Sequence, residues 1–314
     1  MSALLLTAPS VGLVGDALVG EPPATWHPVA WFGSVMARAE AAYWSDDRRA
    51  GVAHLVIGVG LANMAATGLD LLLGRRVAAA VATSVALGGG MLGSVANDVA
   101  GSLERGDLPT ARSQLRSLVG RDPSSLDEVD IVRAVVESVA ENTVDAVTAT
   151  LWWAALGGAS GALLHRAVNT LDAMVGHRTA RYDRFGWASA RADDAANWIP
   201  ARLTVLAVAA VRPRRARAVW RVVRRDHRNH PSPNGGVVEA AFAGALGVRL
   251  SGVNDYGGST ERRGPLGDGC VPARADIRAA VRLSRDVAWL TALVPAVVGA
   301  TIWADGARRE RGRK

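Results

Sequence analysis

Three carboxylates recur every four residues in the stretch ESVAENTVD: Glu137, Glu141 and Asp145. A helix places all three on one face, where like charges repel by a few tenths of a kcal/mol per exposed pair. Because Asn142 lies within this triplet and an apolar run from 146 to 158 follows it, we expect a compensating cation nearby. A metal ion, an arginine cluster or a bound substrate would each serve, and a solvated acidic face is the alternative.

A second polar stretch, residues 165–202, combines carboxylates, amides and guanidinium groups. At helical spacing Arg166, Asn169 and Asp172 share one face, and Asn197 shares another with Asp193 or Asp194. Such mixtures suit phosphate and metal binding. An ion-pair network on a soluble loop is the alternative interpretation.

A third stretch, HPSPNGG from His230 to Gly236, is a proline- and glycine-rich loop that leads to Glu239 at the start of a predicted helix. A helix N-terminus there would offer free backbone N–H groups to an anion. The glycines do not match the phosphate-binding pattern G-x-x-x-x-G-K-[ST], so this stretch is not a P-loop.

The composition indicates a polytopic membrane protein. The 314 residues are 49% hydrophobic and 21% charged, and the mean hydropathy is +0.14. The net charge of +7 comes almost entirely from arginine, which fits the cytoplasmic flank of a membrane protein. Few aromatic residues are available to stack on bases, so nucleic acid is not an expected partner. The single cysteine, Cys270, excludes an internal disulfide.

Apolar segments of suitable length predict an all-α fold of four or five membrane spans. The predicted spans are 3–19, 51–73, 77–100, 147–164 and 287–303. We expect a single helical membrane domain over 1–314, in which the polar inter-helix segments 101–146, 165–202 and 212–285 form the site. The block from Arg212 to Arg228 holds eight arginines and predicts a cytoplasmic helix that faces lipid headgroups.

Several long blocks together resemble one family. ESVAENTVDAVTATLWWAALGG, RAVNTLDAMVGHRTARYDRFGWASARADDAANWIPARLT and HPSPNGGVVEAAFAGALGVRLSG occur in this order, after an opening block from Gly15 to Val29. They are similar to the blocks of the cobalamin-biosynthesis family CobD/CbiB, adenosylcobinamide-phosphate synthase. The resemblance extends from about residue 3 to about residue 303. Two positions depart from the family pattern: Thr150 replaces a usual proline, and His177 replaces an expected tyrosine.

The resemblance implies an amide ligation in the cell membrane. The propionate carboxylate of adenosylcobyric acid is joined to the amine of (R)-1-amino-2-propanol O-2-phosphate, supported by ATP and Mg²⁺, to give adenosylcobinamide phosphate. The corrinoid is thus a substrate, and the expected partners are these two substrates, the lipid bilayer and other late cobalamin-assembly membrane enzymes. Activating a carboxylate most simply proceeds through an acyl phosphate, which requires Mg²⁺ and cations that neutralise phosphate.

Residue roles follow from combining this chemistry with the three polar stretches. We predict a catalytic group of residues that orients the amine or holds a metal ion. Either Glu141 or His230 in this group acts as the general base. We also predict a substrate- or phosphate-binding group, in which arginine forks grip phosphate, and a metal-binding group. The catalytic group is Glu137, Glu141, Asn142, Asp145 and His230; the substrate-binding group is Arg166, Asn169, Asp172, Tyr182, Trp187, Arg191, Arg202, Ser232, Asn234 and Glu239; and the metal group is Asp193, Asp194 and Asn197.

Two other functions fit the same composition. A membrane transporter would use acidic residues near the spans as an ion or proton path, but paired sequence halves, which many transporters have, are not evident. A non-catalytic membrane partner is the second alternative. Single carboxylate substitutions discriminate between an enzyme and a non-catalytic partner. A non-catalytic partner should tolerate substitutions that abolish the activity of an enzyme.

Overall fold

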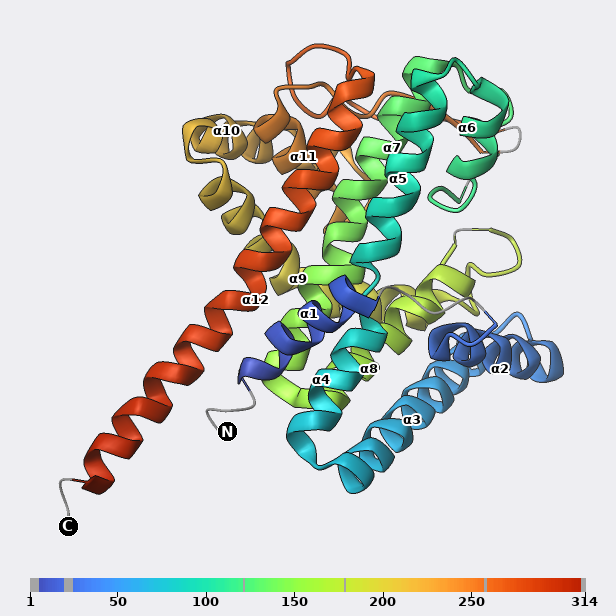
Figure 1. The fold of residues 1–314 in the computed structure, drawn as a ribbon. Helices are drawn as coiled ribbons and strands as arrows, with labels where there is room; N and C mark the ends of the chain where they lie inside the picture. The colour runs from blue at the N-terminus through green and yellow to red at the C-terminus, as the bar shows by residue number, and fades with distance from the viewer. Residues whose placement is uncertain (1–5, 20–24, 121, 178, 257–258, 312–314) are drawn as a thin grey trace. The chain divides into compact units, whose positions relative to one another are not determined.

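The computed structural model describes residues 6–19, 25–120, 122–177, 179–256 and 259–311. Its elements are almost all helices (Figure 1), which confirms the predicted helical class. Glu21, Pro22 and Pro23 of the opening block lie outside the described residues. The main helices are α1 (Ala8–Val19), α2 (Pro28–Tyr43), α3 (Arg48–Leu73), α4 (Arg75–Ala86), α5 (Gly89–Glu104), α6 (Leu108–Leu115), α7 (Glu128–Thr143), α8 (Ala149–Val175), α9 (Trp187–Val211), α10 (Ala216–Asp226), α11 (Gly235–Leu246) and α12 (Arg274–Arg311).

Four helical stretches of the described chain are long and apolar enough to cross a membrane: Arg48–Leu73, Arg75–Glu104, Glu128–Val175 and Arg274–Thr301. They correspond to four of the five predicted spans. Helix α3 carries exposed apolar side chains such as Val56, Met64 and Leu71, as expected for a helix that faces lipid. The chain is therefore a polytopic helical membrane protein.

Two predicted spans differ from the structure. In the predicted span 3–19, the described residues form the 12-residue helix α1, which is about 18 Å long at 1.5 Å per residue and too short to cross a bilayer. The predicted span 77–100 is interrupted at Leu87 and Gly88, between α4 and α5. The glycines from 88 to 90 make this break intelligible, because glycine weakens a helix interior.

The chain divides into two compact units, each assembled from separate stretches of sequence. The first unit comprises Met1–Gly88, Ala149–Asn197 and Thr291–Lys314. The second comprises Gly89–Thr148 and Trp198–Leu290.

The core of the first unit consists of small side chains on α3, α4 and α8. Seven buried alanines form one cluster: Ala66, Ala78, Ala82, Ala86, Ala154, Ala159 and Ala162. Helices α4 and α8 lie side by side (Figure 1), and α1 also packs on α4. At Gly12 of α1, an added Cβ would lie 2.6 Å from a side-chain carbon of Thr83. Small residues thus let these backbones approach closely, as is common between membrane helices.

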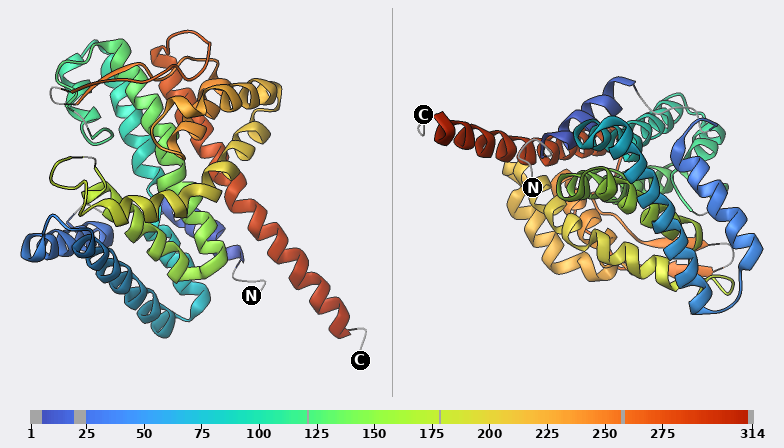
Figure 2. Two further views of the ribbon diagram at one scale, coloured as in Figure 1. Left: turned by 180° about the vertical axis from the view of Figure 1, so that it is seen from behind. Right: turned by 90° about the horizontal axis from the view of Figure 1, so that it is seen from below.

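The second unit is organised around α11, which is buried from Gly235 to Ala245. A helix that is apolar on all sides is stable only when its neighbours cover it. Helix α10 packs along α11 (Figure 2), and α7 also contacts α11. Helix α11 ends at Leu246 and is capped by Gly247, whose φ of 76° is a left-handed conformation that glycine adopts easily.

Most of the polar stretch 165–202 lies on the helices α8 and α9. The turn connecting these helices, 176–186, carries His177 and Tyr182. In the segment 212–285, the exceptions to helical structure include a short antiparallel hairpin of β1 (Val253–Tyr256) and β2 (Ser259–Arg262).

Candidate functional site

The acidic triplet begins on α7 and ends beyond it. Glu137 and Glu141 are one turn apart on α7, but Asp145 lies in η2, a π-helical turn over Val144–Thr148. The three carboxylates are therefore not carried by one uninterrupted α-helix, and that Asp145 shares the face of Glu137 and Glu141 stays a prediction. π-Turns inserted in helices occur often at functional sites. Asn142 donates a hydrogen bond of 2.9 Å to the carbonyl of Ser138, one turn earlier.

Glu137 connects α7 to the loop that precedes the hairpin. Its Oε1 accepts a hydrogen bond of 2.6 Å from the backbone N–H of Ser251, and Arg133 lies 4.0 Å away on the previous turn. Ser251 has a φ of 66°, which is costly for a residue with a side chain. Glu137 thus holds a strained loop in place in addition to contributing charge.

His230 and Glu239 form a buried pair next to this acidic face. Their Nε2 and Oε1 atoms are 3.3 Å apart, and the two side chains are only 5% and 4% exposed. Arg263 places Nη1 2.9 Å from the same Nε2. In one tautomer this nitrogen accepts from Arg263, and in the other it donates to Glu239. The imidazole is therefore placed to pass a proton to or from a buried acid.

The surroundings of Glu239 favour the binding of a proton or another cation at its carboxylate. Burial is the largest effect that raises the pKa of Glu239 well above its usual value, and the charges of Glu137 and Glu141 raise it further, whereas Arg263 opposes the shift. An added Cβ at Gly235 would lie 3.3 Å from Oε1 of Glu141 and 3.0 Å from Cε1 of His230. The absence of a side chain at Gly235 therefore lets the acids and the imidazole converge on the first turn of α11.

The loop before α11 is fixed by its own hydrogen bonds. The Ser232 hydroxyl accepts from the backbone N–H groups of Asn234 and Gly235, at 3.2 and 3.0 Å. Arg202 donates to Oδ1 of Asn234 at 2.8 Å and stacks 4.5 Å above the ring of Trp198. The N–H group of Gly235, at the start of α11, therefore already donates to Ser232 and is not free for the anion that the sequence suggested there.

A second polar network joins α8 to α9 within the first unit. Asn169 and Asn197 donate to the two carboxylate oxygens of Asp193, at 3.3 and 3.0 Å. Since the amide of Asn197 donates to Asp193, its Oδ1 accepts from His165 Nε2 at 2.9 Å. The hydroxyl of Thr150 is 3.2 Å from the other ring nitrogen. Thr150, one of the departures from the family pattern, thereby completes a buried chain of hydrogen bonds.

Asp193 titrates in an unusual range. Burial raises the pKa of Asp193 to about 6, the charge of Asp194 adds to the increase, and the bonds from Asn169 and Asn197 limit it. The sequence interpretation allowed Asp193 or Asp194 to share the face with Asn197, and the structure places Asp193 there.

The remaining predicted residues of the first unit lie in different settings. The Tyr182 hydroxyl donates to buried Glu40 at 2.9 Å, and Arg48 lies 5.1 Å above the Trp187 ring. Outside the set of predicted site residues, burial and, to a lesser degree, the charge of Arg166 lower the pKa of His27. Of the other predicted residues, Arg191 is exposed. Arg166, Asp172 and Asp194 are partly buried.

Several residues of these networks were not among the predicted site residues. Arg263 follows the hairpin and is 33 positions from His230, so no local spacing indicates the contact. His165 was visible only as one polar residue in a dense stretch. Glu40 receives both Tyr182 and, at 3.0 Å, Arg181, and its helix α2 carries no other acidic residue.

No group of three or more His, Cys, Asp or Glu side chains is arranged as a metal cage in the described ranges of the chain. Mg²⁺ nevertheless needs only one or two protein carboxylates when substrate phosphates supply its other ligands. Both oxygens of Asp193 are already engaged by amides. The assignment of Asp193, Asp194 and Asn197 to metal therefore stays a prediction.

Comparisons with known proteins give one consistent result. A family model described as CobD/Cbib protein matches residues 9–284, which include every predicted site residue. Proteins described as "Cobalamin biosynthesis protein CobD" are similar over most of their length. The one from Mycobacterium tuberculosis is 46% identical over 283 residues, covering 88% of this chain and 90% of the relative. That from Geobacter metallireducens is 42% identical over 309 residues, covering 94% and 96%. No solved structure matches.

Proposed function

The chain belongs to the CobD/CbiB family of cobalamin biosynthesis proteins, and from this we propose that it catalyses an ATP-dependent amide ligation in the cell membrane. The substrates are adenosylcobyric acid and (R)-1-amino-2-propanol O-2-phosphate, and the product is adenosylcobinamide phosphate. The role in cobalamin biosynthesis follows from the family, whereas the reaction and its substrates are our proposal.

The proposed chemistry has two steps. The corrinoid carboxylate attacks the γ-phosphorus of ATP, which forms an acyl phosphate and releases ADP. The substrate amine, once it has lost a proton to a base, attacks the acyl carbon; a C–N bond forms, the C–O bond breaks and inorganic phosphate leaves. ATP would enter as its magnesium complex, and Mg²⁺ would neutralise charge on the phosphates.

The observation that carries the proposal is the cluster of acids around His230, in which Glu239 is buried and Glu137 and Glu141 are partly buried. The charges of Glu137 and Glu141 raise the pKa of Glu239 and so its affinity for a proton, and the amine substrate arrives as an ammonium cation. We assign Glu141 to bind this ammonium, because its Oε1 lies beside Gly235 and His230 at the first turn of α11. His230 accepts the proton that the amine must lose, and Glu239 and Arg263 set the protonation state of His230.

The predicted phosphate ligands include one arginine of the second unit, Arg202. Arg202 faces the loop before α11 and holds Asn234, so its guanidinium is positioned in the same unit as the acidic group. Its fork suits a substrate phosphate, which would have to compete with the bonds to Asn234 and Pro233. Arg166, Asn169, Asp172 and Arg191 stay predictions.

Complementation of a corrinoid auxotroph blocked at this ligation tests the proposal, with cobinamide as the bypass control. Glu141→Gln keeps the shape of the side chain and removes its charge, so we expect growth with the wild-type gene and none with the variant. The matched control is Glu128→Gln on the same helix, where the carboxylate is 42% exposed and pairs with Arg274; this variant should grow. Failure of well-expressed wild-type protein to rescue growth would refute the proposal and favour the transporter.

A further inference from the structure

Helix α10 has two faces of opposite character. Val219, Val222 and Val223 are buried on the side that packs along α11. At Gly244 of α11 an added Cβ would lie 2.8 Å from the backbone α-carbon of Val219, so the two backbones are nearly in contact. Because this packing fixes the rotation of α10, its arginine face is directed outward by the fold.

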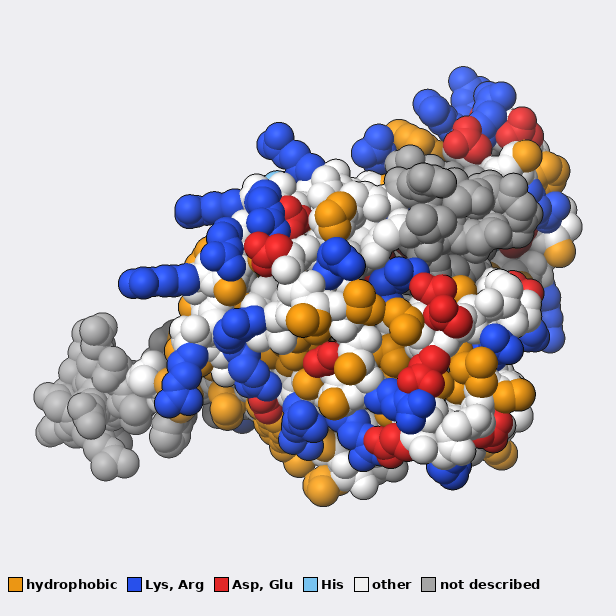
Figure 3. Space-filling view, turned by 90° about the horizontal axis from the view of Figure 1, so that it is seen from above, with side chains coloured by type: hydrophobic (Ala, Val, Ile, Leu, Met, Phe, Trp, Pro, Cys, Tyr) orange, Lys and Arg blue, Asp and Glu red, His pale blue; other side chains and the backbone are white. Residues whose placement is uncertain are grey.

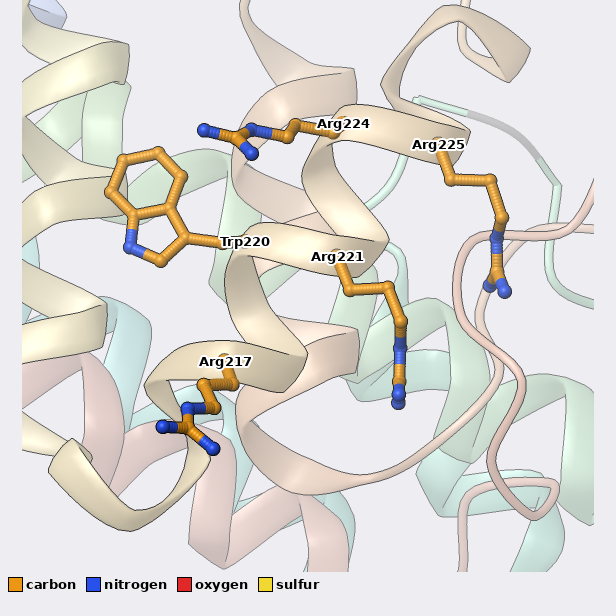
Figure 4. Close-up of a pocket in the computed structure, with 5 residues that line it drawn as sticks. All are labelled: Arg217, Trp220, Arg221, Arg224 and Arg225. Carbon is orange, nitrogen blue, oxygen red and sulfur yellow. The ribbon is translucent and has the colours of Figure 1, made fainter.

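The outward face lines an open cavity of about 650 Å³, whose walls are Arg217, Trp220, Arg221, Arg224 and Arg225. Figure 4 shows the four guanidinium groups and the indole extending from successive turns of α10. Arg217, Arg221 and Arg224 are exposed, and their spacing of four and three residues places them on one face of the helix. Figure 3 shows several basic side chains close together on one part of the surface, with a few acidic side chains among them.

Little negative charge balances this cavity. Arg225 is engaged by Asp226 and by Asp268, at 2.6 and 3.0 Å. Arg217 and Arg224 have no carboxylate oxygen within 4 Å among the residues whose placement is described. The cavity therefore has a net positive charge that its immediate surroundings do not cancel.

We propose that this cavity binds the phosphate headgroup of an anionic phospholipid. Guanidinium forks match phosphate oxygens in geometry and charge. Trp220, which is 37% exposed, provides the amphipathic ring that favours the membrane–water interface. A bilayer surrounds any protein with four membrane-length helices, so anionic headgroups are present at high local concentration, and clustered arginines attract them.

A titration with short-chain phosphatidylglycerol tests this proposal. The purified full-length protein in detergent is titrated and bound lipid is counted by native mass spectrometry, with phosphatidylcholine of the same chain length as the neutral comparison. The test variant is the triple substitution Arg217→Gln, Arg221→Gln and Arg224→Gln, which spares Arg225 and its ion pairs. Circular dichroism and thermal unfolding establish that each variant is folded.

The matched control loses the same charge elsewhere. Arg116, Arg274 and Arg278 each pair with a carboxylate, on Asp122, Glu128 and Glu104. Their triple substitution to Gln also changes the net charge by three. An effect of net charge alone would appear equally in both triple variants.

We expect the wild-type protein and the control to prefer phosphatidylglycerol over phosphatidylcholine, and added salt to weaken this preference. Because an arginine near an anionic surface contributes about five-fold, the test variant should bind phosphatidylglycerol on the order of 100-fold more weakly. Equal binding by the test variant and the wild type would overturn the proposal. So would unchanged lipid binding with a raised KM for ATP or aminopropanol phosphate, which would assign the cavity to a substrate phosphate.

Discussion

Asp193 makes the stability of this protein depend on pH in a direction that the structure defines. Burial raises the pKa of its carboxyl from 3.8 to about 6. Between these two values the folded protein holds a proton that the unfolded chain releases. The native state then binds more protons, so the free energy of unfolding falls as the pH rises from about 4 to about 6. Above that range the loss is complete and constant.

The size of this effect follows from the shift. A difference of about two pKa units, at 1.36 kcal/mol for each unit, corresponds to roughly 3 kcal/mol. Asp193→Asn removes the titrating group while keeping the shape of the side chain. The difference in unfolding free energy between the wild type and the variant should therefore change by roughly 3 kcal/mol across this window.

Equilibrium unfolding in mixed detergent micelles, repeated from pH 4 to pH 8, measures this difference. Other carboxyls titrate in the same window, so only the comparison with the variant isolates Asp193. Asp183→Asn, which removes a carboxylate from an exposed position, serves as the control and should retain the dependence of the wild type. If Asp193→Asn retains it as well, the carboxyl of Asp193 is not held protonated by its burial, and the argument fails.

Two further predictions concern packing and buried hydrogen bonds, and the same unfolding assay measures both. Gly12→Ala should destabilise the protein by about 1–3 kcal/mol, because the new methyl would lie 2.6 Å from a side-chain carbon of α4. Gly60→Ala, where nothing lies within 4 Å, should instead stabilise by about 0.5–1 kcal/mol; effects of equal sign would contradict the packing described. Glu40→Ala removes the acceptor shared by Arg181 and Tyr182 and should cost about 1–3 kcal/mol, whereas a neutral result would show that water replaces the carboxylate.

The sequence was sufficient to predict the helical membrane class, because lengths of apolar residues alone decide which helices can cross a bilayer. It was not sufficient for the ends and interruptions of those helices. The break between α4 and α5 and the short length of α1 depend on which backbone conformations the tertiary packing stabilises. Asp145 illustrates the same limit, since its four-residue spacing from Glu141 predicts an α-helical face and the chain forms a π-turn there.

Within the candidate site, spacing predicted the residues that share a helix and missed those brought in from elsewhere. Asn197 and Asp193 are four residues apart on α9, and the structure joins them as the helical period requires. Arg263 and His165 reach their partners through tertiary packing. A single sequence gives no sign of such contacts. The number of residues between the two partners depends on the helices and loops that connect them, and not on the chemistry of the contact.

The most direct test of the proposed reaction uses the purified protein in lipid nanodiscs with adenosylcobyric acid, aminopropanol phosphate, ATP and Mg²⁺. We predict that mass spectrometry detects adenosylcobinamide phosphate, formed in step with one ADP per amide, and that Glu141→Gln lowers this rate by at least about 100-fold, within the range for loss of a catalytic acid–base or charge-stabilising group. Glu128→Gln should retain the wild-type rate. Wild-type protein that binds these substrates and forms no amide, or Glu141→Gln protein with the wild-type rate, would contradict the account.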